Sequence, residues 1–147
     1  PGKLGCYLRS GFYRFVMTSC APNVLIGFAT LFSQQDTEID EGVYIGPQCN
    51  IGKCAIGKNT LLGSGVHIMS GKGQHNFSDP EKPIKDQGGV FTKVIIGENC
   101  WLGNGALIMA NVGKGSVVAA GSVVVDDVPE GVVVGGNPAK LLKRVSV

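Results

Sequence analysis

The sequence is poor in charged residues and has no long hydrophobic run. Asp, Glu, Lys and Arg make up only 16% of the 147 residues, and the formal net charge is +2. This balance is too weak to indicate nucleic-acid binding, and no cluster of Lys and Arg with interleaved aromatics occurs. No unbroken stretch of about 18 apolar residues occurs either, so no transmembrane segment is expected. Residues 12–32 are apolar in places, but Arg14 within them does not fit a signal peptide.

Cysteine and histidine occur in numbers that argue against two common kinds of site. The five cysteines are an odd number with no C-x-x-C pair, and no histidine stands at zinc spacing. We therefore expect neither a disulfide framework nor a metal site, and a reduced cytoplasm is the simpler environment. The length suits one domain with one core. Because the chain begins at Pro1 rather than methionine, we expect further residues before it in the natural protein.

Glycine is in clear excess, with 23 copies. Excess glycine without low complexity indicates many tight turns and favours a repeat fold. An aliphatic residue, often followed by glycine, recurs about every six positions: Ile26, Ile39, Ile45, Ile51, Ile56, Leu62, Ile68, Ile96, Leu102, Ile108, Val112, Val118, Val124 and Val134. Four positions after most of these comes a smaller residue: Cys49, Ala55, Thr60, Val66, Cys100, Ala106, Ser116 and Ser122.

A period of six fits neither a helix nor a simple alternating strand. It fits a triangular coil in which each side is a short strand, the aliphatic residue points inward and the smaller residue fills the space near the corner. Stacked coils give each strand hydrogen-bond partners above and below. We therefore predict an all-β fold, a left-handed parallel β-helix with a protruding loop and short terminal caps. Alternation places Cys49 and Cys100 inside, and His67 and Trp101 outside.

One segment, residues 71–93, interrupts the repeat, and the pattern resumes on its far side. A loop this long inside a compact domain is usually functional or disordered. We divide the chain into an N-terminal cap at residues 1–22 and a β-helix domain at residues 23–147. A short amphipathic helix over residues 4–20 is expected to cap the open end. Its two arginines among aromatic residues leave contact with a membrane surface as the alternative.

An ordered set of motifs in residues 39–144 carries a resemblance to a known family. The motifs are NFSDP directly after His75, Pro83-Ile84 behind it, VIIGENCWLG at residues 94–103, VAAGSVV at residues 118–124 and GNPAK at residues 136–140. With them the chain resembles the hexapeptide acyltransferases. Within that family it is similar to the galactoside and maltose acetyltransferases and to the O-acetyltransferases of bacterial surface polysaccharides.

The resemblance implies that His75 is the catalytic base. It would deprotonate an acceptor hydroxyl, which attacks the thioester carbonyl of acetyl-CoA by direct transfer in a ternary complex. The imidazolium would then protonate the leaving thiolate. Asp79 or a backbone carbonyl is expected to orient the imidazole. The resemblance implies acetyl-CoA as acyl donor and no metal.

The resemblance also places coenzyme A along the C-terminal coils, between neighbouring subunits of a homotrimer. It implies cofactor contacts at Trp101, Asn104, Ala120, Lys140 and Lys143. Plain subunit packing is the alternative for Trp101, and a solvated basic tail is the alternative for the two lysines. The sequence departs from its relatives at Val125-Asp126, where they often carry Thr-Lys, and the coil at residues 109–112 is about two residues short.

The same residues argue against other functions of a β-helix. A γ-class carbonic anhydrase shares the β-helix but needs three histidines for zinc, whereas this sequence has two. A non-catalytic scaffold or binding protein would explain the repeat but neither the loop with His75 nor the GNPAK ending. Serine, an amino sugar or an antibiotic hydroxyl are alternative acceptors. A saccharide or polysaccharide-precursor hydroxyl leads, and we expect the enzyme in the cytoplasm or at the inner membrane surface.

Overall fold

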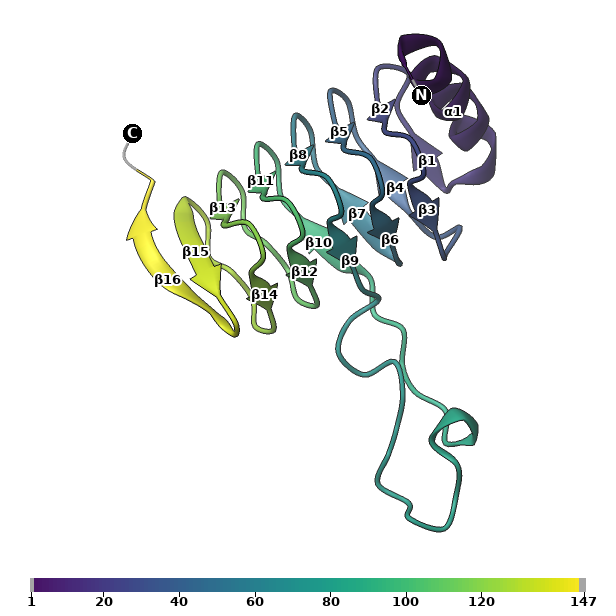
Figure 1. The fold of residues 1–147 in the computed structure, drawn as a ribbon, viewed down its shortest axis with the longest axis vertical. Helices are drawn as coiled ribbons and strands as arrows, with labels where there is room; N and C mark the ends of the chain where they lie inside the picture. Colours follow the sequence, from purple (N-terminus) through teal and green to yellow (C-terminus); the bar gives the residue numbers. More distant parts are fainter. Residues whose placement is uncertain (1, 146–147) are drawn as a thin grey trace.

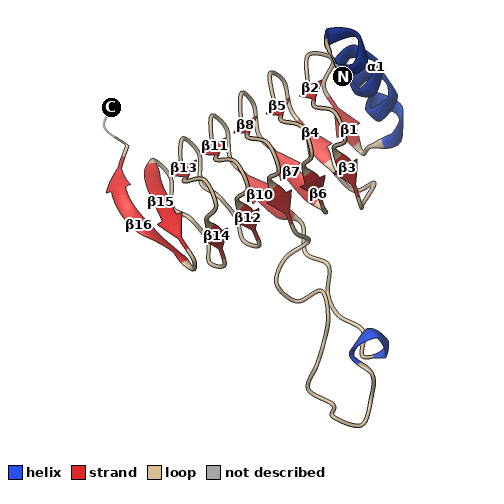
Figure 2. Cartoon of the chain, in the orientation of Figure 1, coloured by secondary structure: helices blue, strands red, loops and turns tan. Residues whose placement is uncertain are grey.

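The computed structural model describes residues 2–145, which form a helix followed by a stack of triangular coils (Figure 1). Helix α1 (Lys3–Val16) lies at the N-terminal end of the stack, and the last strand lies at the C-terminal end (Figure 2). Three sheets, called A, B and C, run along the three sides of the stack. The described residues therefore form a nearly all-β solenoid, as the six-residue period predicts, while its left-handed sense stays a prediction.

In each of the first four coils, every sheet takes one short strand. Sheet A contains β1 (Ser19–Cys20), β4 (Glu38–Ile39), β7 (Cys54–Ile56) and β10 (Val94–Ile96). Sheet B contains β2 (Leu25–Ile26), β5 (Tyr44–Ile45), β8 (Leu61–Leu62), β11 (Trp101–Leu102), β13 (Val117–Val118), β15 (Val132–Gly136) and β16 (Ala139–Arg144). Sheet C contains β3 (Leu31–Phe32), β6 (Asn50–Ile51), β9 (His67–Ile68), β12 (Leu107–Ile108) and β14 (Val123–Val124). A 3-10 turn, η1 (Ile84–Asp86), lies in the excursion.

The chain passes from sheet A to B to C and back to A, so equivalent positions of successive coils pair in parallel. In sheet B, for example, Trp101 pairs with Leu61 on one side and with Val117 on the other. In the last two coils, sheet A is reduced to single bridges at Val112 and Val128. Strand amides thus find their acceptors in the neighbouring coil, as the Tyr44 amide does at the Thr60 carbonyl at 3.0 Å, which satisfies the short strands without helices.

The core is a set of columns of aliphatic side chains inside the coils. Ile45, Ile51 and Leu62 are fully buried, and the residue two positions before each of them also points inward. Where that residue carries a hydroxyl, the hydroxyl hydrogen-bonds the backbone of the next coil: that of Thr60 donates to the Gly97 carbonyl at 2.8 Å, and that of Ser122 accepts from the Gly136 amide at 3.1 Å. The inward register predicted for Cys49 is confirmed, and the column explains why the repeat requires a small residue there.

One predicted inward position is wrong. Ala55 lies half-buried between two buried residues of β7, and Cys54 takes the inward position. The cause is the length of the corner between sheets C and A, where the step from the inward Ile51 to the inward Ile56 is five positions rather than six. Counting six residues from Ile51 therefore puts the alternation out of register by one.

The corner between sheets C and A is the one that varies from coil to coil. The steps from sheet A to B and from B to C are always six residues between inward positions, as from Ile96 to Leu102. The steps across the C–A corner are seven residues at Phe32 to Ile39, five at Ile51 to Ile56, 28 at Ile68 to Ile96, and four at both Ile108 to Val112 and Val124 to Val128. The excursion is thus an insertion at the C–A corner of one coil, and the short coil noted in the sequence is a shortening of the same corner in the next coil.

The two ends of the stack are covered differently. Helix α1 ends at Val16, where the Met17 amide donates to the Tyr13 carbonyl at 3.0 Å. The helix is shorter than the expected residues 4–20, because Ser19–Cys20 already pairs with β4 in sheet A. That strand lies ahead of the predicted domain boundary at residue 22. At the other end, β16 folds back antiparallel on β15 and closes the stack.

Candidate active site

The excursion is a stalk with two hydrogen-bonded legs that projects away from the coils (Figure 1). It leaves after β9 and returns into β10. The Thr92 amide donates to the Ser70 carbonyl at 2.9 Å, and the Val90 amide donates to the Gly73 carbonyl at 2.7 Å. Further out, the Asn76 amide donates to the Gly88 carbonyl at 2.8 Å. The segment that lacks a six-residue period therefore has a defined backbone arrangement of its own.

The return of the excursion is tied to sheet A by ion pairs. Lys93 contacts the carboxylates of both Asp36 and Glu38, and Lys53 also contacts Asp36 at 3.1 Å. Hydrogen bonds from Lys93 and then from Lys53 lower the pKa of Asp36, and the pKa of Lys93 is raised by Asp36 and Glu38. The base of the stalk is therefore held electrostatically as well as by the backbone.

The tip of the excursion is organised around the side chain of Gln87. Its amide nitrogen donates to the carbonyls of Asp79 at 2.8 Å and Lys82 at 2.7 Å, and its amide oxygen accepts from the Asp79 backbone N–H at 3.1 Å. The Asp79 carboxylate accepts from the Glu81 backbone N–H at 3.0 Å. Within residues 2–145, no hydrogen bond joins Asp79 to His75, so the orienting role of Asp79 stays a prediction.

His75 lies exposed on the first leg of the stalk. Its backbone is held closely, because Gly89 on the second leg packs against the peptide between Gln74 and His75. A Cβ added at Gly89 would overlap the Gln74 carbonyl oxygen and would lie 2.8 Å from the His75 nitrogen. The stalk thus presents the imidazole to its surroundings from a fixed backbone.

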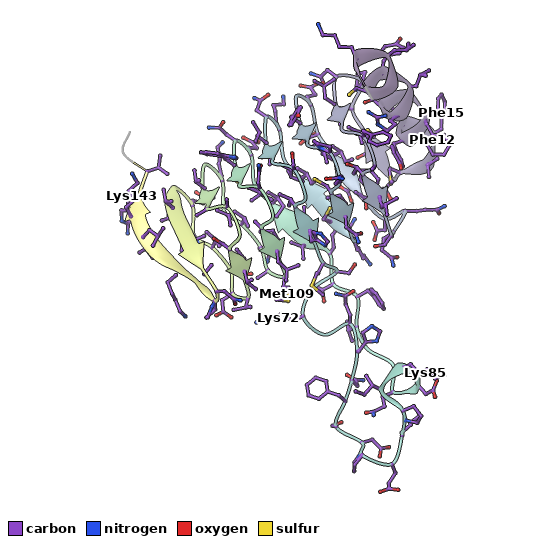
Figure 3. All side chains as sticks on the ribbon, viewed as in Figure 1. Phe12, Phe15, Lys72, Lys85, Met109 and Lys143 are labelled. Atoms are coloured by element: carbon purple, nitrogen blue, oxygen red, sulfur yellow. The ribbon has the colours of Figure 1, made fainter. Side chains whose placement is uncertain are left out.

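A groove runs along the C–A corner at the base of the excursion. It has a volume of about 470 Å³ and is lined by residues 71–73, 92–94, 109–111 and 125–127. Its floor is formed by the two C–A corners with four-residue steps, Ile108 to Val112 and Val124 to Val128. Lys72 and Met109 lie close together at this point (Figure 3), and Lys72 pairs with Asp126 at 3.2 Å. The departure at Val125-Asp126 therefore places an ion pair across the groove.

The predicted cofactor residues lie on the other side of sheet C or at the C-terminal end. Asn104 and Ala120 occupy the corner between sheets B and C in neighbouring coils, where the Gly121 amide donates to the Asn104 carbonyl at 2.9 Å. The Asn104 side-chain oxygen also accepts from the Ser64 amide at 3.1 Å. Lys140 and Lys143 are exposed on β16, paired with Gly135 and Val133.

Trp101 points outward, as predicted, and is 54% exposed. It belongs to a row of outward side chains that runs the length of sheet B. The row consists of Leu25, Tyr44, Leu61, Trp101, Val117 and Val133, which are paired in register. Four of these are exposed large apolar side chains, which favours the subunit-packing interpretation of Trp101.

One chain does not bring all the predicted residues together. His75 extends from the C–A corner, whereas Asn104 and Ala120 occupy the B–C corner. The two groups therefore lie at opposite ends of the sheet C strands. Neither the groove nor the ion pairs of Lys93 were predicted from the sequence. Four-residue steps at the C–A corner are the sequence signal that marks the groove, whereas the ion pairs join residues too far apart in the chain to be matched by pattern.

The histidine and cysteine assignments follow the predicted alternation. His67 lies on the outer face of sheet C, and Cys100 is buried. Burial raises the pKa of the Cys54 thiol to about 12, and raises the pKa of Cys49 and Cys100 as well. In residues 2–145, no group of three or more His, Cys, Asp or Glu side chains is placed to hold a metal ion. No helix in that part of the chain is long and apolar enough to cross a bilayer.

Comparison with known proteins decides the family. The chain is 30% identical over 142 residues to the galactoside O-acetyltransferase of Lactococcus lactis subsp. lactis, across 79% of this chain and 67% of that protein. The chain belongs to the hexapeptide-repeat acetyltransferases. A galactoside acetyltransferase solved in complex with coenzyme A shares the fold, with a TM-score of 0.73 at 20% identity over 97% of this chain and 82% of that one. No family model matches the chain.

Other family members match over shorter segments. The chain is 59% identical over 56 residues to the 2,3,4,5-tetrahydropyridine-2,6-dicarboxylate N-acetyltransferase of Clostridium perfringens, across 37% of this chain. It spans about a quarter of the length of that relative, at 24%. Both O- and N-acetyltransferases are therefore found among its relatives.

Proposed function

We propose that this hexapeptide-repeat protein is an acetyl-CoA-dependent O-acetyltransferase that acts on a saccharide or polysaccharide-precursor hydroxyl. The observation that carries the proposal is the excursion. It interrupts an otherwise regular solenoid to present His75, exposed, from a backbone that Gly89 and the leg hydrogen bonds hold in place. A scaffold would need the coils but would not need a fixed stalk with an exposed imidazole at its side.

The chemistry is general-base catalysis of acyl transfer. The neutral imidazole of His75 accepts the proton of the acceptor hydroxyl as the oxygen attacks the thioester carbonyl of acetyl-CoA. The tetrahedral intermediate collapses with cleavage of the C–S bond, and the imidazolium returns the proton to the departing CoA thiolate. The products are the O-acetyl ester and CoA-SH, with His75 regenerated. A positioned base of this kind contributes about 10²- to 10⁴-fold to the rate.

The donor site is assigned to the C-terminal coils. Asn104 and Ala120 form a continuous strip along the B–C corner, and Lys140 and Lys143 offer exposed cations for the phosphates of coenzyme A. The galactoside acetyltransferase with the same fold binds coenzyme A.

The complete site is assigned to the boundary between two chains of a homotrimer. His75 and the donor residues occupy opposite edges of sheet C, so the stalk of one chain must meet the B–C corner of a neighbour. The apolar row on sheet B, from Leu25 to Val133, supplies a surface for such association. A closed ring then forms one site at each boundary.

The acceptor class is inferred from the relatives. The similarity to a galactoside O-acetyltransferase extends over most of the chain and favours a sugar hydroxyl. Since acetyl-CoA is an intracellular metabolite, we place the reaction in the cytoplasm, including the membrane surface that faces it.

The two histidines of the sequence provide a matched test of the base. His75→Ala is expected to reduce CoA release from acetyl-CoA by about 10²-fold or more with any working acceptor. His67→Ala, which removes the exposed histidine of β9, is expected to retain activity. Both changes are at exposed side chains, so unfolding temperatures are expected to stay close to that of the wild type. A fully active His75→Ala protein would rule out His75 as the base.

The acceptor class is tested separately by thiol detection. Oligosaccharides, sugar nucleotides, amino sugars, serine and chloramphenicol are offered with acetyl-CoA, and the product is examined by mass spectrometry for an ester or an amide. An ester on a saccharide is the expected result. An amide on an amino sugar would replace the O-acetyl assignment with N-acetyl transfer. A chain that binds no acetyl-CoA would favour the scaffold function.

A further inference from the structure

Helix α1 is docked on the solenoid through the face that carries Arg9, Ser10 and Tyr13. The Ser10 hydroxyl is buried and lies 2.6 Å from the Val24 carbonyl oxygen, and the Arg9 Nε donates to the Ile26 carbonyl at 2.9 Å. The Tyr13 ring packs against the Phe32 ring, with centroids 4.5 Å apart and planes tilted by 54°. These contacts fix the rotation of the helix about its own axis.

The fixed rotation leaves the apolar stripe of α1 facing outward. The stripe consists of Leu4, Tyr7, Leu8, Phe12 and Phe15, which are 73%, 77%, 62%, 61% and 92% exposed. Spacings of three and four residues place all five on one face of a helix. Phe12 and Phe15 lie on the side of α1 away from the coils (Figure 3). An amphipathic helix in a globular protein normally buries this stripe, so here it is available to another surface.

An apolar groove continues from the stripe to the first coil. It has a volume of about 770 Å³ and lies between α1 and residues 22–25, with Tyr7 and Leu25 among its lining residues. Lys3 and Arg14 also line it. The surface thus combines exposed rings, an apolar hollow and two cations at one end of the molecule.

The charge of this end is entirely positive. No Asp or Glu occurs before Asp36, whereas Lys3, Arg9 and Arg14 all lie in α1. Arg9 is engaged with the Ile26 carbonyl, and among residues 2–145 neither Lys3 nor Arg14 forms an ion pair. A second copy docked on this face would bring like charges together, whereas an anionic bilayer complements both the cations and the apolar stripe.

We propose that α1 anchors the protein to the surface of an anionic bilayer. Leu8, Phe12 and Phe15 enter the boundary between headgroups and acyl chains, and Lys3 and Arg14 contact lipid phosphates. The helix lies in the plane of the membrane with the solenoid on its cytoplasmic side. This inference is independent of the proposed transferase activity, because the stalk with His75 leaves the coils elsewhere (Figure 1).

The test is flotation of the full chain with vesicles. Vesicles of equal parts phosphatidylcholine and phosphatidylglycerol are expected to carry the wild-type protein, and vesicles of phosphatidylcholine alone are expected to carry far less. Added salt should weaken binding, because it screens the contact of Lys3 and Arg14 with the lipid phosphates. Phe12→Gln with Phe15→Gln is expected to lower binding by more than about tenfold, because two phenyl rings no longer leave water.

A matched control comes from the other end of the molecule. Leu141 and Leu142 on β16 are both 62% exposed, so Leu141→Gln with Leu142→Gln removes a comparable apolar surface and is expected to leave flotation unchanged. Circular dichroism checks that each variant is folded. Wild-type protein that stays soluble with the anionic vesicles would overturn the proposal. Equal flotation of the Phe12 and Phe15 variant would do so too, as would further self-association through this face in place of lipid binding.

Discussion

At the scale of single residues, the inward positions account for the unusual cysteine content. Cys49, Cys54 and Cys100 are small apolar fillers of the columns, and burial raises the pKa of all three thiols. Alternation from the neighbouring aliphatic residue predicted this for Cys49 and Cys100. It failed for Cys54, because the five-residue corner before it shifts the register, and the length of that corner is not contained in the repeat itself.

This arrangement predicts the thiol reactivity of the folded protein. The native chain is expected to react with a disulfide reagent at no more than two of its five cysteines, namely the partly exposed Cys6 and Cys20. Cys54 should react most slowly, because a thiol whose pKa is about 12 holds almost no thiolate at neutral pH. Titration in denaturant should reveal all five thiols. Rapid modification of Cys54 in the folded state would contradict its placement in the core.

The close approach of Gly89 to the backbone at His75 predicts a positioning effect. Gly89→Ala is expected to displace the peptide between Gln74 and His75 and to lower kcat about ten- to a hundredfold, with little change in KM for acetyl-CoA. Gly73→Ala is the matched control in the same stalk, because a Cβ there meets nothing nearer than the Val90 carbonyl at 3.8 Å. Steady-state kinetics on both variants distinguish the two, and equal activity would remove this role of Gly89.

At the scale of elements, the excursion was visible in the sequence as a break in the repeat at residues 71–93. The sequence did not reveal how the segment is held. Its legs are joined by backbone hydrogen bonds such as that from Thr92 to Ser70, and its base by ion pairs between Lys93 and residues of sheet A. Backbone pairing of this kind depends on the path of the loop rather than on side-chain type, so no residue pattern announces it.

The ion pairs at the base predict a pH dependence for the stalk. Hydrogen bonds from Lys93 and Lys53 lower the pKa of Asp36 below its ordinary value of 3.8. The stabilisation is therefore present above about pH 4 and is lost as the pH falls through the lowered pKa. Hydrogen exchange at the amides of Thr92 and Val94, corrected for intrinsic rates, should show protection at about pH 7 that decreases towards about pH 3. In Asp36→Asn the protection should already be reduced at neutral pH.

A pH-independent protection factor, equal in the wild type and in Asp36→Asn, would contradict a role of these ion pairs in holding the stalk where it joins the coils.

The N-terminal helix was also predicted only in part from the sequence. Amphipathicity predicted a helical cap, and α1 does cover the first coil, but its apolar stripe faces away from the coils. The orientation is decided by the Ser10 and Arg9 hydrogen bonds to coil carbonyls, which no helical pattern encodes.

At the scale of the whole molecule, the period of six specifies the stacked coils and their three sheets. The motifs around His75 and Lys140 specify the family. The relative position of the site residues follows from neither, because it depends on which corner of the triangle each residue occupies. His75 extends from the C–A corner, and Ala120 lies at the B–C corner of the same chain. We therefore propose that one transferase site is built from two chains.

The most direct measurement of that claim is complementation between two inactive variants. His75→Ala removes the base, and Ala120→Trp fills the donor strip at an exposed position of the B–C corner. Each variant alone is expected to release almost no CoA. Trimers assembled from an equal mixture, with co-assembly verified by two affinity tags, should regain about a quarter of the wild-type activity, because that share of boundaries pairs an intact His75 with an intact neighbour. Mixed trimers that are no more active than either parent would contradict the shared site.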